Sequence, residues 1–303
     1  MSLHYWALLF ILSFVWGGSF FFIEVALNSV SPFTLVFLRV SIAAIILMGF
    51  TYAQKQYLPK RIKDWYYFFV MGLLNNALPF TLIVWGQTYI TGSVASILNA
   101  MTPIFTILVA HLFTQDERLS FNKLTGVVLG FSGVMIMMLP TLEEGISWKS
   151  YGQLAVLGAA LSYAFAGVWG KKLNYNSPMV NSTGMLICSS IIMLPTVLLI
   201  DFSNNNQVMI TLPSALAVIA LATISTAFAY GIYFKILSEA GATNISLVTL
   251  LVPVSAIFLG ATLLNEVLQK QALIGMLVIF CGLIIIDGRL SKKLLNKVLA
   301  ERQ

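Results

Sequence analysis

Residues 117–133 read ERLSFNKLTGVVLGFSG, and residues 266–282 read EVLQKQALIGMLVIFCG. In both stretches a glutamate is followed by glycines nine and sixteen residues later, within sequence that is otherwise mostly apolar. Apolar sequence aligns with itself easily, so a single match carries little weight. A glutamate and two glycines at identical spacing indicate instead that the chain contains two copies of one unit.

The repeat continues outside these two stretches at an offset close to 150 residues. Ser96 and Pro103 match Ser246 and Pro253, each serine standing seven residues before its proline. Two further pairs of segments contribute matches: Leu12, Ser13 and Gly18 with Leu161, Ser162 and Gly167, and Asn75, Asn76, Ala77 and Phe80 with Ser225, Thr226, Ala227 and Tyr230. Matches in four pairs of segments predict that the whole chain is duplicated.

The composition describes a membrane protein. Of the 303 residues 59% are apolar and 9% are charged, and the mean hydropathy is +0.91. Soluble domains have roughly 45–50% apolar and about 25% charged residues, so this chain has too few charged residues to form a surface that water would solvate. That excludes a cytosolic enzyme, a disordered chain and a disulfide-rich secreted module. Both cysteines, Cys188 and Cys281, lie in apolar runs, and we expect no disulfide, metal or cofactor.

Ten apolar segments are long enough to cross a membrane, which takes about 20 residues in a helix. The first lacks the basic residues and cleavage site of a signal peptide, so we expect it to remain in the protein. We therefore predict an all-α integral membrane protein with ten transmembrane helices. The predicted spans are residues 5–27, 33–53, 65–87, 93–113, 123–140, 151–170, 179–200, 212–234, 242–264 and 271–287.

The distribution of Lys and Arg predicts the orientation of these spans. Fourteen of the 17 basic residues fall on the side of the termini, Arg39 lies within a span, and Lys149 and Lys270 fall on the other side. Basic residues accumulate in cytoplasmic loops, so we expect both termini in the cytoplasm of a cell whose inner or plasma membrane holds the protein. This accounts for the net charge of +6 without a nucleic-acid partner. The basic tail is expected to contact anionic lipid headgroups.

Each predicted repeat contains five spans, and this odd number makes the second repeat enter the membrane from the opposite side. The first repeat covers residues 5–140, the second residues 151–287, and the tail residues 288–303. In this arrangement Glu117 is cytoplasmic and Glu266 is external. Inverted repeats are typical of secondary transporters, whose substrate site lies between the halves near the middle of the membrane.

A further set of residues carries a resemblance to a known family. It comprises residues 14–20 (FVWGGSF), residues 24–27 (EVAL), Arg39, and the repeated proline and glutamate–glycine patterns. With these features the sequence resembles the EamA family of ten-helix transporters in the drug/metabolite transporter superfamily. The resemblance implies alternating access and export of small metabolites, with amino acids prominent among family substrates. It also implies a central site lined by the first, third, fourth, sixth, eighth and ninth spans.

The most polar point of the third span is Asn75–Asn76, and Ser225–Thr226 is its polar counterpart in the second half. Pro79, four residues after Asn75, is a candidate hinge or kink because it removes a backbone hydrogen bond. Amide and hydroxyl groups in the middle of a span need partners. Two interpretations remain open. These groups bind substrate on a cavity wall, or they form hydrogen bonds between helices.

Two other groups of residues are candidates for the same cavity. Asn99 and Thr249 lie four residues before Pro103 and Pro253, and these prolines are expected to bend the fourth and ninth spans. The bends are interpreted either as hinges or as rigid features of packing. Aromatic side chains deep in their spans are candidate lining residues because they offer an apolar body with a polar tip; they are Trp16, Tyr163 and Tyr230.

Glu24 and Arg39 are the only charged residues well inside predicted spans. A charge there costs about 2.5–3.5 kcal/mol on insertion scales, so we expect the two to pair in the outer half of the membrane. The pair is either a static link between helices or a carboxylate that binds a proton during transport. Transport is accordingly downhill, as in a passive facilitator, or coupled to protons through Glu24.

An intramembrane hydrolase is the alternative from another class. Ser132 lies between two glycines and His111 is the nearest conceivable base, but the repeat places Cys281 at the position of Ser132. The shared feature is therefore the glycine spacing, and we predict no enzyme. With a single intramembrane cation, the substrate is expected to be a small amphipathic or zwitterionic molecule. Rows of small residues serve internal packing and dimerisation equally, so the sequence leaves the oligomeric state open.

Overall fold

A computed structural model describes residues 3–114, 120–143, 145–173, 176–201, 209–241, 245 and 247–287, and over these residues all regular secondary structure is helical. Apolar side chains dominate every long helix, and intrahelical hydrogen bonds satisfy the backbone where water is absent. The elements are α1 (Leu3–Leu27), α2 (Pro32–Ala53), α3 (Ile62–Gly72), η1 (Leu73–Ala77), α4 (Leu78–Gly86), α5 (Gly92–Asn99), α6 (Thr102–Phe113), α7 (Phe121–Glu143), α8 (Trp148–Gly170), η2 (Lys171–Leu173), α9 (Pro178–Thr196), η3 (Val197–Asp201), α10 (Leu212–Ala222), η4 (Thr223–Phe228), α11 (Ala229–Ala240), α13 (Val248–Leu263) and α14 (Lys270–Asp287).

The described helices confirm the predicted fold class. Among the residues that the structure describes, nine helical stretches are long and apolar enough to cross a membrane, and α13 is a shorter apolar helix of 16 residues. The sequence predicts a span over residues 242–264 at this place, and residues 242–244 and 246 of it lie outside the described residues. The other predicted spans agree with the observed helices to within about three residues at most ends, as expected for boundaries set by apolar length.

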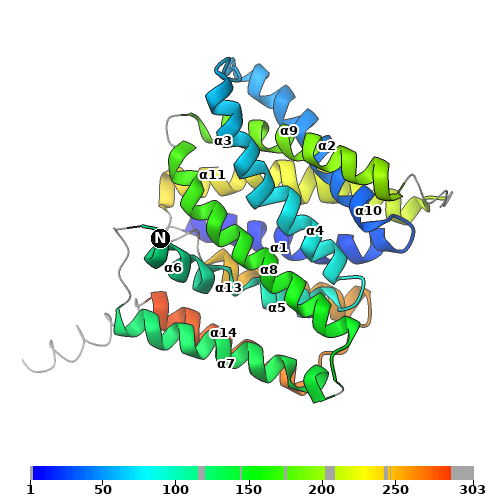
Figure 1. Cartoon of the computed structure of the whole chain (residues 1–303), viewed down its shortest axis with the longest axis vertical. Helices are drawn as coiled ribbons and strands as arrows, with labels where there is room; N and C mark the ends of the chain where they lie inside the picture. Colours follow the sequence, from blue (N-terminus) through cyan, green and yellow to red (C-terminus); the bar gives the residue numbers. More distant parts are fainter. Residues whose placement is uncertain are drawn as a thin grey trace, which may run out of the picture.

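Helices α7 and α14 run side by side along one edge of the molecule (Figure 1). The glycines of the two repeated stretches lie in this contact. A Cβ atom added at Gly133 would lie 2.6 Å from the carbonyl oxygen of Gly275, and one added at Gly126 would lie 2.6 Å from that of Gly282. The repeated spacing therefore serves close backbone approach between two helices, as small residues do in membrane bundles.

Helix α1 lies near the centre of the molecule and packs against α13, α10, α11 and α5. Its closest approach is to α13, where a Cβ atom on Gly17 would lie 2.6 Å from the Cβ of Ser255. The neighbouring Gly18 has ordinary clearance, since a Cβ there would meet nothing nearer than 3.7 Å. The contact of α1 with α13 joins a helix from the beginning of the chain to one near its end.

The third and eighth spans are interrupted by wider helical turns. Leu73–Ala77 and Thr223–Phe228 are π-helical, and each joins two α-helices of one span. A π turn contains one extra residue and often marks a functional site. Pro79 follows the first of these turns, near the start of α4, which continues from η1 without a break.

The prolines of the fourth and ninth spans have different effects. The fourth span is broken between α5 and α6, and Pro103 lies in the first turn of α6. Pro253 lies inside the continuous helix α13. The bend predicted at Pro103 is therefore a break between two helices, whereas α13 continues through its proline.

Candidate functional site

A cavity of about 820 Å³ lies between helices from both halves of the chain. No residue of α7 or α14 belongs to its described lining, and residues of α2 and α9 contribute in addition to the spans implied by the family resemblance. The predicted site residues that line it are Trp16, Arg39, Asn75, Asn99, Tyr163, Thr226, Tyr230 and Thr249. Ser225, the neighbour of Thr226 in the predicted polar pair, also lines the cavity; the lining residues that sequence reasoning missed include Ser19, Phe80, Ser96, Thr102, Ser182, Tyr233 and Phe234.

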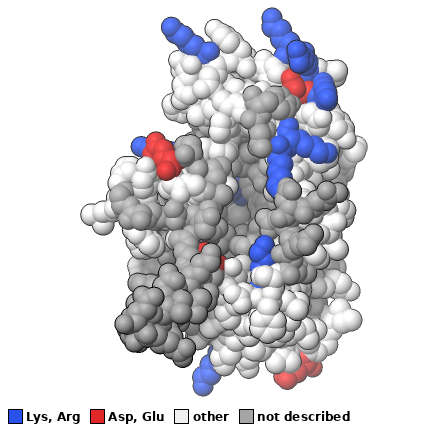
Figure 2. Space-filling model, turned by 90° about the vertical axis from the view of Figure 1, so that its left-hand side faces the viewer, with Lys and Arg blue, Asp and Glu red and all other residues white. Residues whose placement is uncertain are grey.

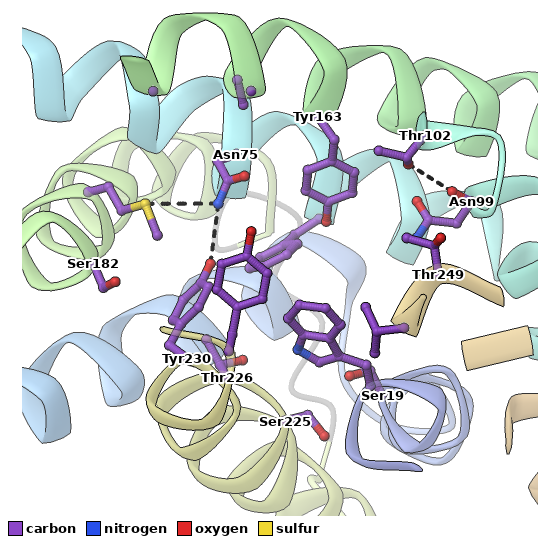
Figure 3. A pocket seen from close by; sticks show the side chains of 18 of the residues that line it. Ser19, Asn75, Asn99, Thr102, Tyr163, Ser182, Ser225, Thr226, Tyr230 and Thr249 are labelled. Carbon is purple, nitrogen blue, oxygen red and sulfur yellow. Dashed lines mark hydrogen bonds between the residues drawn. The ribbon is translucent and has the colours of Figure 1, made fainter. Parts of the chain in front are cut away.

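At one end of the cavity, Asn75 and Tyr230 approach each other from η1 and α11 (Figure 3). The Asn75 amide donates to the Tyr230 hydroxyl at 3.3 Å, and this hydroxyl donates to the Asn76 Oδ1 at 2.9 Å. Asn76 is fully buried, lies outside the cavity lining, and donates to Ser189 Oγ at 3.2 Å. Asn75 therefore lines the cavity, and its binding of substrate stays a prediction. Asn76, predicted to bind substrate with it, lies outside the lining and instead links helices.

The second polar group lies around Asn99 and Thr249 (Figure 3). Thr102 donates to the backbone carbonyl of Asn99 at 2.7 Å. The side-chain oxygens of Asn99 and Ser19 have no hydrogen-bond partner among the described residues, although both atoms are buried. Buried polar atoms without partners are uncommon in folded proteins, and both of these oxygens belong to residues of the cavity lining.

Aromatic rings form much of the remaining wall. Trp16 and Tyr233 pack with ring centroids 5.6 Å apart, and Tyr230 stacks on Phe234 at 6.1 Å. Such walls present large apolar faces at little cost in side-chain entropy. The cavity is therefore mostly apolar with a few fixed polar groups, as small-molecule sites are.

Arg39 brings a positive charge to this cavity. Its side chain is 6% exposed, its Nε donates to Thr226 Oγ1 at 3.0 Å, and its guanidinium carbon lies 3.6 Å from the centroid of the Phe80 ring. A cation over an aromatic face gains about 0.5–2 kcal/mol, less than the cost of burying the charge. Arg39 forms no ion pair among the described residues, so its charge is only partly compensated.

The predicted pair between Glu24 and Arg39 is wrong. Glu24 instead accepts a hydrogen bond from the backbone N–H of Gly92 at 2.9 Å, while Arg39 binds Thr226. Glu24 does not line the cavity. Its charged neighbour is Glu266, which accepts a hydrogen bond from the backbone N–H of Ser93 at 3.2 Å.

The cavity reaches the segment that joins α8 to α9. Gly170, Lys171, Asn176 and Asn181 belong to its lining there, and Lys171 is exposed. This end is on the side of the molecule where α1 begins, and Figure 2 shows that face hollowed at its centre with Lys and Arg side chains along one edge of the hollow. The cavity is therefore accessible from the face on which Leu3, the first residue of α1, lies.

The residues of the hydrolase alternative are not arranged as a catalytic site. Ser132 is exposed on α7, which contributes no residue to the described cavity lining, and its hydroxyl donates to the carbonyl of Val128 at 2.9 Å. A nucleophilic serine needs a base within hydrogen-bond reach. Within the part of the chain that the structure describes, no group of three His, Cys, Asp or Glu side chains could hold a metal ion.

Comparison with known proteins decides the family. The sequence profile of the EamA-like transporter family matches residues 4–139 and again residues 150–287. The chain belongs to the EamA-like transporter family. It is thus a membrane transporter and not an enzyme, as the sequence predicted, and the cavity described above is the candidate transport site of an EamA protein.

Individual relatives of this EamA protein span nearly its full length. A probable amino-acid metabolite efflux pump of Salmonella typhimurium is 28% identical over 278 residues, covering 89% of this chain and 90% of the relative. An uncharacterized transporter of Bacillus subtilis, YoaV, is 24% identical and covers 89% and 91%. A solved crystal structure at 17% identity covers 97% of this chain and 99% of its own, with a TM-score of 0.69, which supports the fold.

Proposed function

We propose that this transporter exports small amphipathic metabolites by alternating access, and that its cavity here is open toward the cytoplasm. The observation that carries the proposal is one cavity of about 820 Å³, lined by residues from both halves and accessible from one face. A transporter that exposes a central site to each side in turn requires such a cavity. The relatives named as efflux pumps support export as the direction.

The side to which the cavity opens follows from the charge distribution. Lys171 lies at the opening, on the side to which the sequence assigns fourteen of the 17 basic residues. Basic loops remain in the cytoplasm during insertion, so we assign this side to the cytoplasm of the inner or plasma membrane. A substrate made in the cell would then enter directly from the cytoplasm.

The opposite end offers a place for a coupling proton. Glu24 and Glu266 interact with each other at the start of α5, and the carboxylate of Glu24 is partly buried. Two carboxylates in one site repel each other unless they share a proton. Because Glu24 does not line the cavity, we infer that a proton bound there favours closure of the external end and acts without touching substrate.

Metabolite profiling of the culture medium tests export. Cells overproducing the protein are compared with cells producing Gly167→Leu, a change intended to fill the cavity: Gly167 belongs to the lining, and an added Cβ meets nothing nearer than 3.9 Å. Gly49→Leu is the matched control, since Gly49 is exposed on α2, outside the cavity lining, with nothing within 4 Å of an added Cβ.

We expect a small set of compounds to be enriched outside cells with the unmodified protein and with Gly49→Leu, and not with Gly167→Leu. Equal metabolite concentrations in the media of all three cultures, with the protein present in the membrane, would contradict export. A collapse of the pH gradient separates coupled transport from passive facilitation, because only coupled export against a concentration gradient stops.

A further inference from the structure

We propose that Arg39 binds a single carboxylate of the substrate, and that the aromatic wall around it receives the apolar body of the same molecule. The inference rests on the proposed function and names the chemical class of what is carried: a small monocarboxylate with an aromatic or branched apolar group.

The hydrogen-bonding state of Arg39 leaves room for such a ligand. Its Nε is occupied by Thr226 and one ring face of Phe80 lies against the guanidinium carbon. Among the described residues, no group accepts a hydrogen bond from its two terminal nitrogens. That outer edge of the guanidinium presents two parallel N–H groups, which match the two oxygens of a carboxylate.

The charges around the cavity favour an anion. Its described lining contains Arg39 and Lys171 and no acidic side chain. Lys171 is exposed at the opening, whereas Arg39 is 6% exposed. A buried cation without a counter-ion is costly, and a carboxylate brought by the substrate removes that cost. A buried site with one cation suits one negative charge better than the two of a phosphate group.

The surroundings of Arg39 determine the rest of the molecule. The phenol groups of Tyr163 and Tyr230 lie within electrostatic range of the guanidinium, and Tyr230 is held by Asn75 and Asn76. Trp16 and Tyr233 supply apolar faces in the same cavity. Aromatic and branched apolar groups gain most from such a wall because they bury the largest apolar area.

Ligand binding to the purified protein in detergent tests this proposal directly. The probes are benzoate, 3-phenylpropionate and indole-3-acetate, each compared with its primary amide, which has the same shape and no charge. Affinity is obtained from the dependence of the thermal unfolding midpoint on probe concentration, because a ligand that binds the folded state raises that midpoint. We expect the acids to raise the midpoint and the amides to leave it unchanged.

Variants at one position identify the group responsible. From the usual strength of hydrogen bonds to a charged group, we expect Arg39→Gln to weaken acid binding about tenfold to hundredfold. Arg39→Lys keeps the charge but loses the paired donors, so it should weaken acid binding by less. Arg61→Gln is the matched control, since Arg61 is exposed outside the cavity lining; it should bind like the unmodified protein.

Three results would overturn the proposal: amides that bind as tightly as acids, acids that bind Arg39→Gln unchanged, or no binding by any acid. The comparison of acid with amide needs no variant, so a misfolded Arg39 variant does not remove the test. Binding in detergent is independent of direction and coupling. If the metabolite experiment shows no export, the binding result can therefore still be interpreted. If no acid binds, the export result can likewise still be interpreted.

Discussion

Glu24 and Glu266 accept hydrogen bonds from two consecutive backbone N–H groups, those of Gly92 and Ser93, at 2.9 and 3.2 Å. These N–H groups belong to the first turn of α5, whose own first donors have no partner within the helix. One carboxylate comes from α1 and the other from the segment after α13. Both ends of the chain therefore hold the same helix start in place, at the end of α1 remote from the cavity opening.

We expect the external end to open more readily as the external pH rises, because loss of the shared proton leaves two adjacent negative charges. Ser19→Cys, in a background with Cys188 and Cys281 replaced by alanine, places a thiol in the cavity lining. Its labelling by an impermeant maleimide should increase between about pH 5 and pH 8, after correction for thiol reactivity.

Glu24→Gln should remove that pH dependence, since an amide cannot lose the proton. Glu143→Gln serves as the control, because Glu143 is exposed at the end of α7. A pH dependence of labelling that survives in Glu24→Gln would count against the proton site and leave Glu24 with a purely structural role.

Gly17→Ala should destabilise the protein by about 1–3 kcal/mol, the usual cost of forcing an extra carbon into a tight contact. The added Cβ would lie 2.6 Å from the Cβ of Ser255 and 2.8 Å from the backbone nitrogen of Ala256. Gly18→Ala is the control, with 3.7 Å of clearance, and should change stability little. Unfolding in detergent measures the stability of both variants, and an equal loss of stability in the two would contradict the close contact of α1 with α13.

Tyr230→Phe should cost about 0.5–1.5 kcal/mol, the net value of one hydrogen bond, because it removes the nearer donor to the buried Oδ1 of Asn76 and leaves only the Asn75 amide, at 3.4 Å. Tyr233→Phe is a matched control on the same helix, since no hydrogen bond of the Tyr233 hydroxyl is present among the described residues. Unfolding of the two variants in detergent gives the comparison. If both phenylalanine variants lose the same stability, the hydrogen bond to Asn76 contributes nothing specific.

The assignment of the two faces can be tested with single cysteines in the same cysteine-free background. Lys149→Cys, at the start of α8, should react with an impermeant maleimide on intact cells. Lys171→Cys, at the other end of that helix and beside the cavity opening, should react only after the cells are permeabilised. The opposite pattern would reverse the orientation and place the opening outside.

The helices were predictable because span length follows from the thickness of the membrane, and apolar runs report it directly. Part of the cavity lining was predictable too, since polar and aromatic side chains deep in a span were the candidates: seven of the eight proposed substrate-binding residues line the cavity, and Asn76 does not. Ser19 and Thr102 were missed because serine and threonine are common throughout such bundles, bonding to the preceding turn of their own helix.

The sequence was misleading where the direction of a side chain around its helix mattered. Glu24 and Arg39 lie in neighbouring spans, but depth alone does not tell which neighbour each side chain faces. The π turns change these directions further, since one extra residue rotates everything that follows by about 100°. Contacts such as that of Glu266 with Ser93 depend on how distant segments pack, and no local pattern reports them.

The two π turns also bear on ancestry. Leu73–Ala77 and Thr223–Phe228 begin 150 residues apart, and each lies in a segment that the same family profile matches. A single inserted residue is the simplest origin of such a turn. One insertion before the gene duplicated explains both turns, whereas later origins require two independent events at the same register. On this account the irregular turn arose before the duplication that produced the two halves.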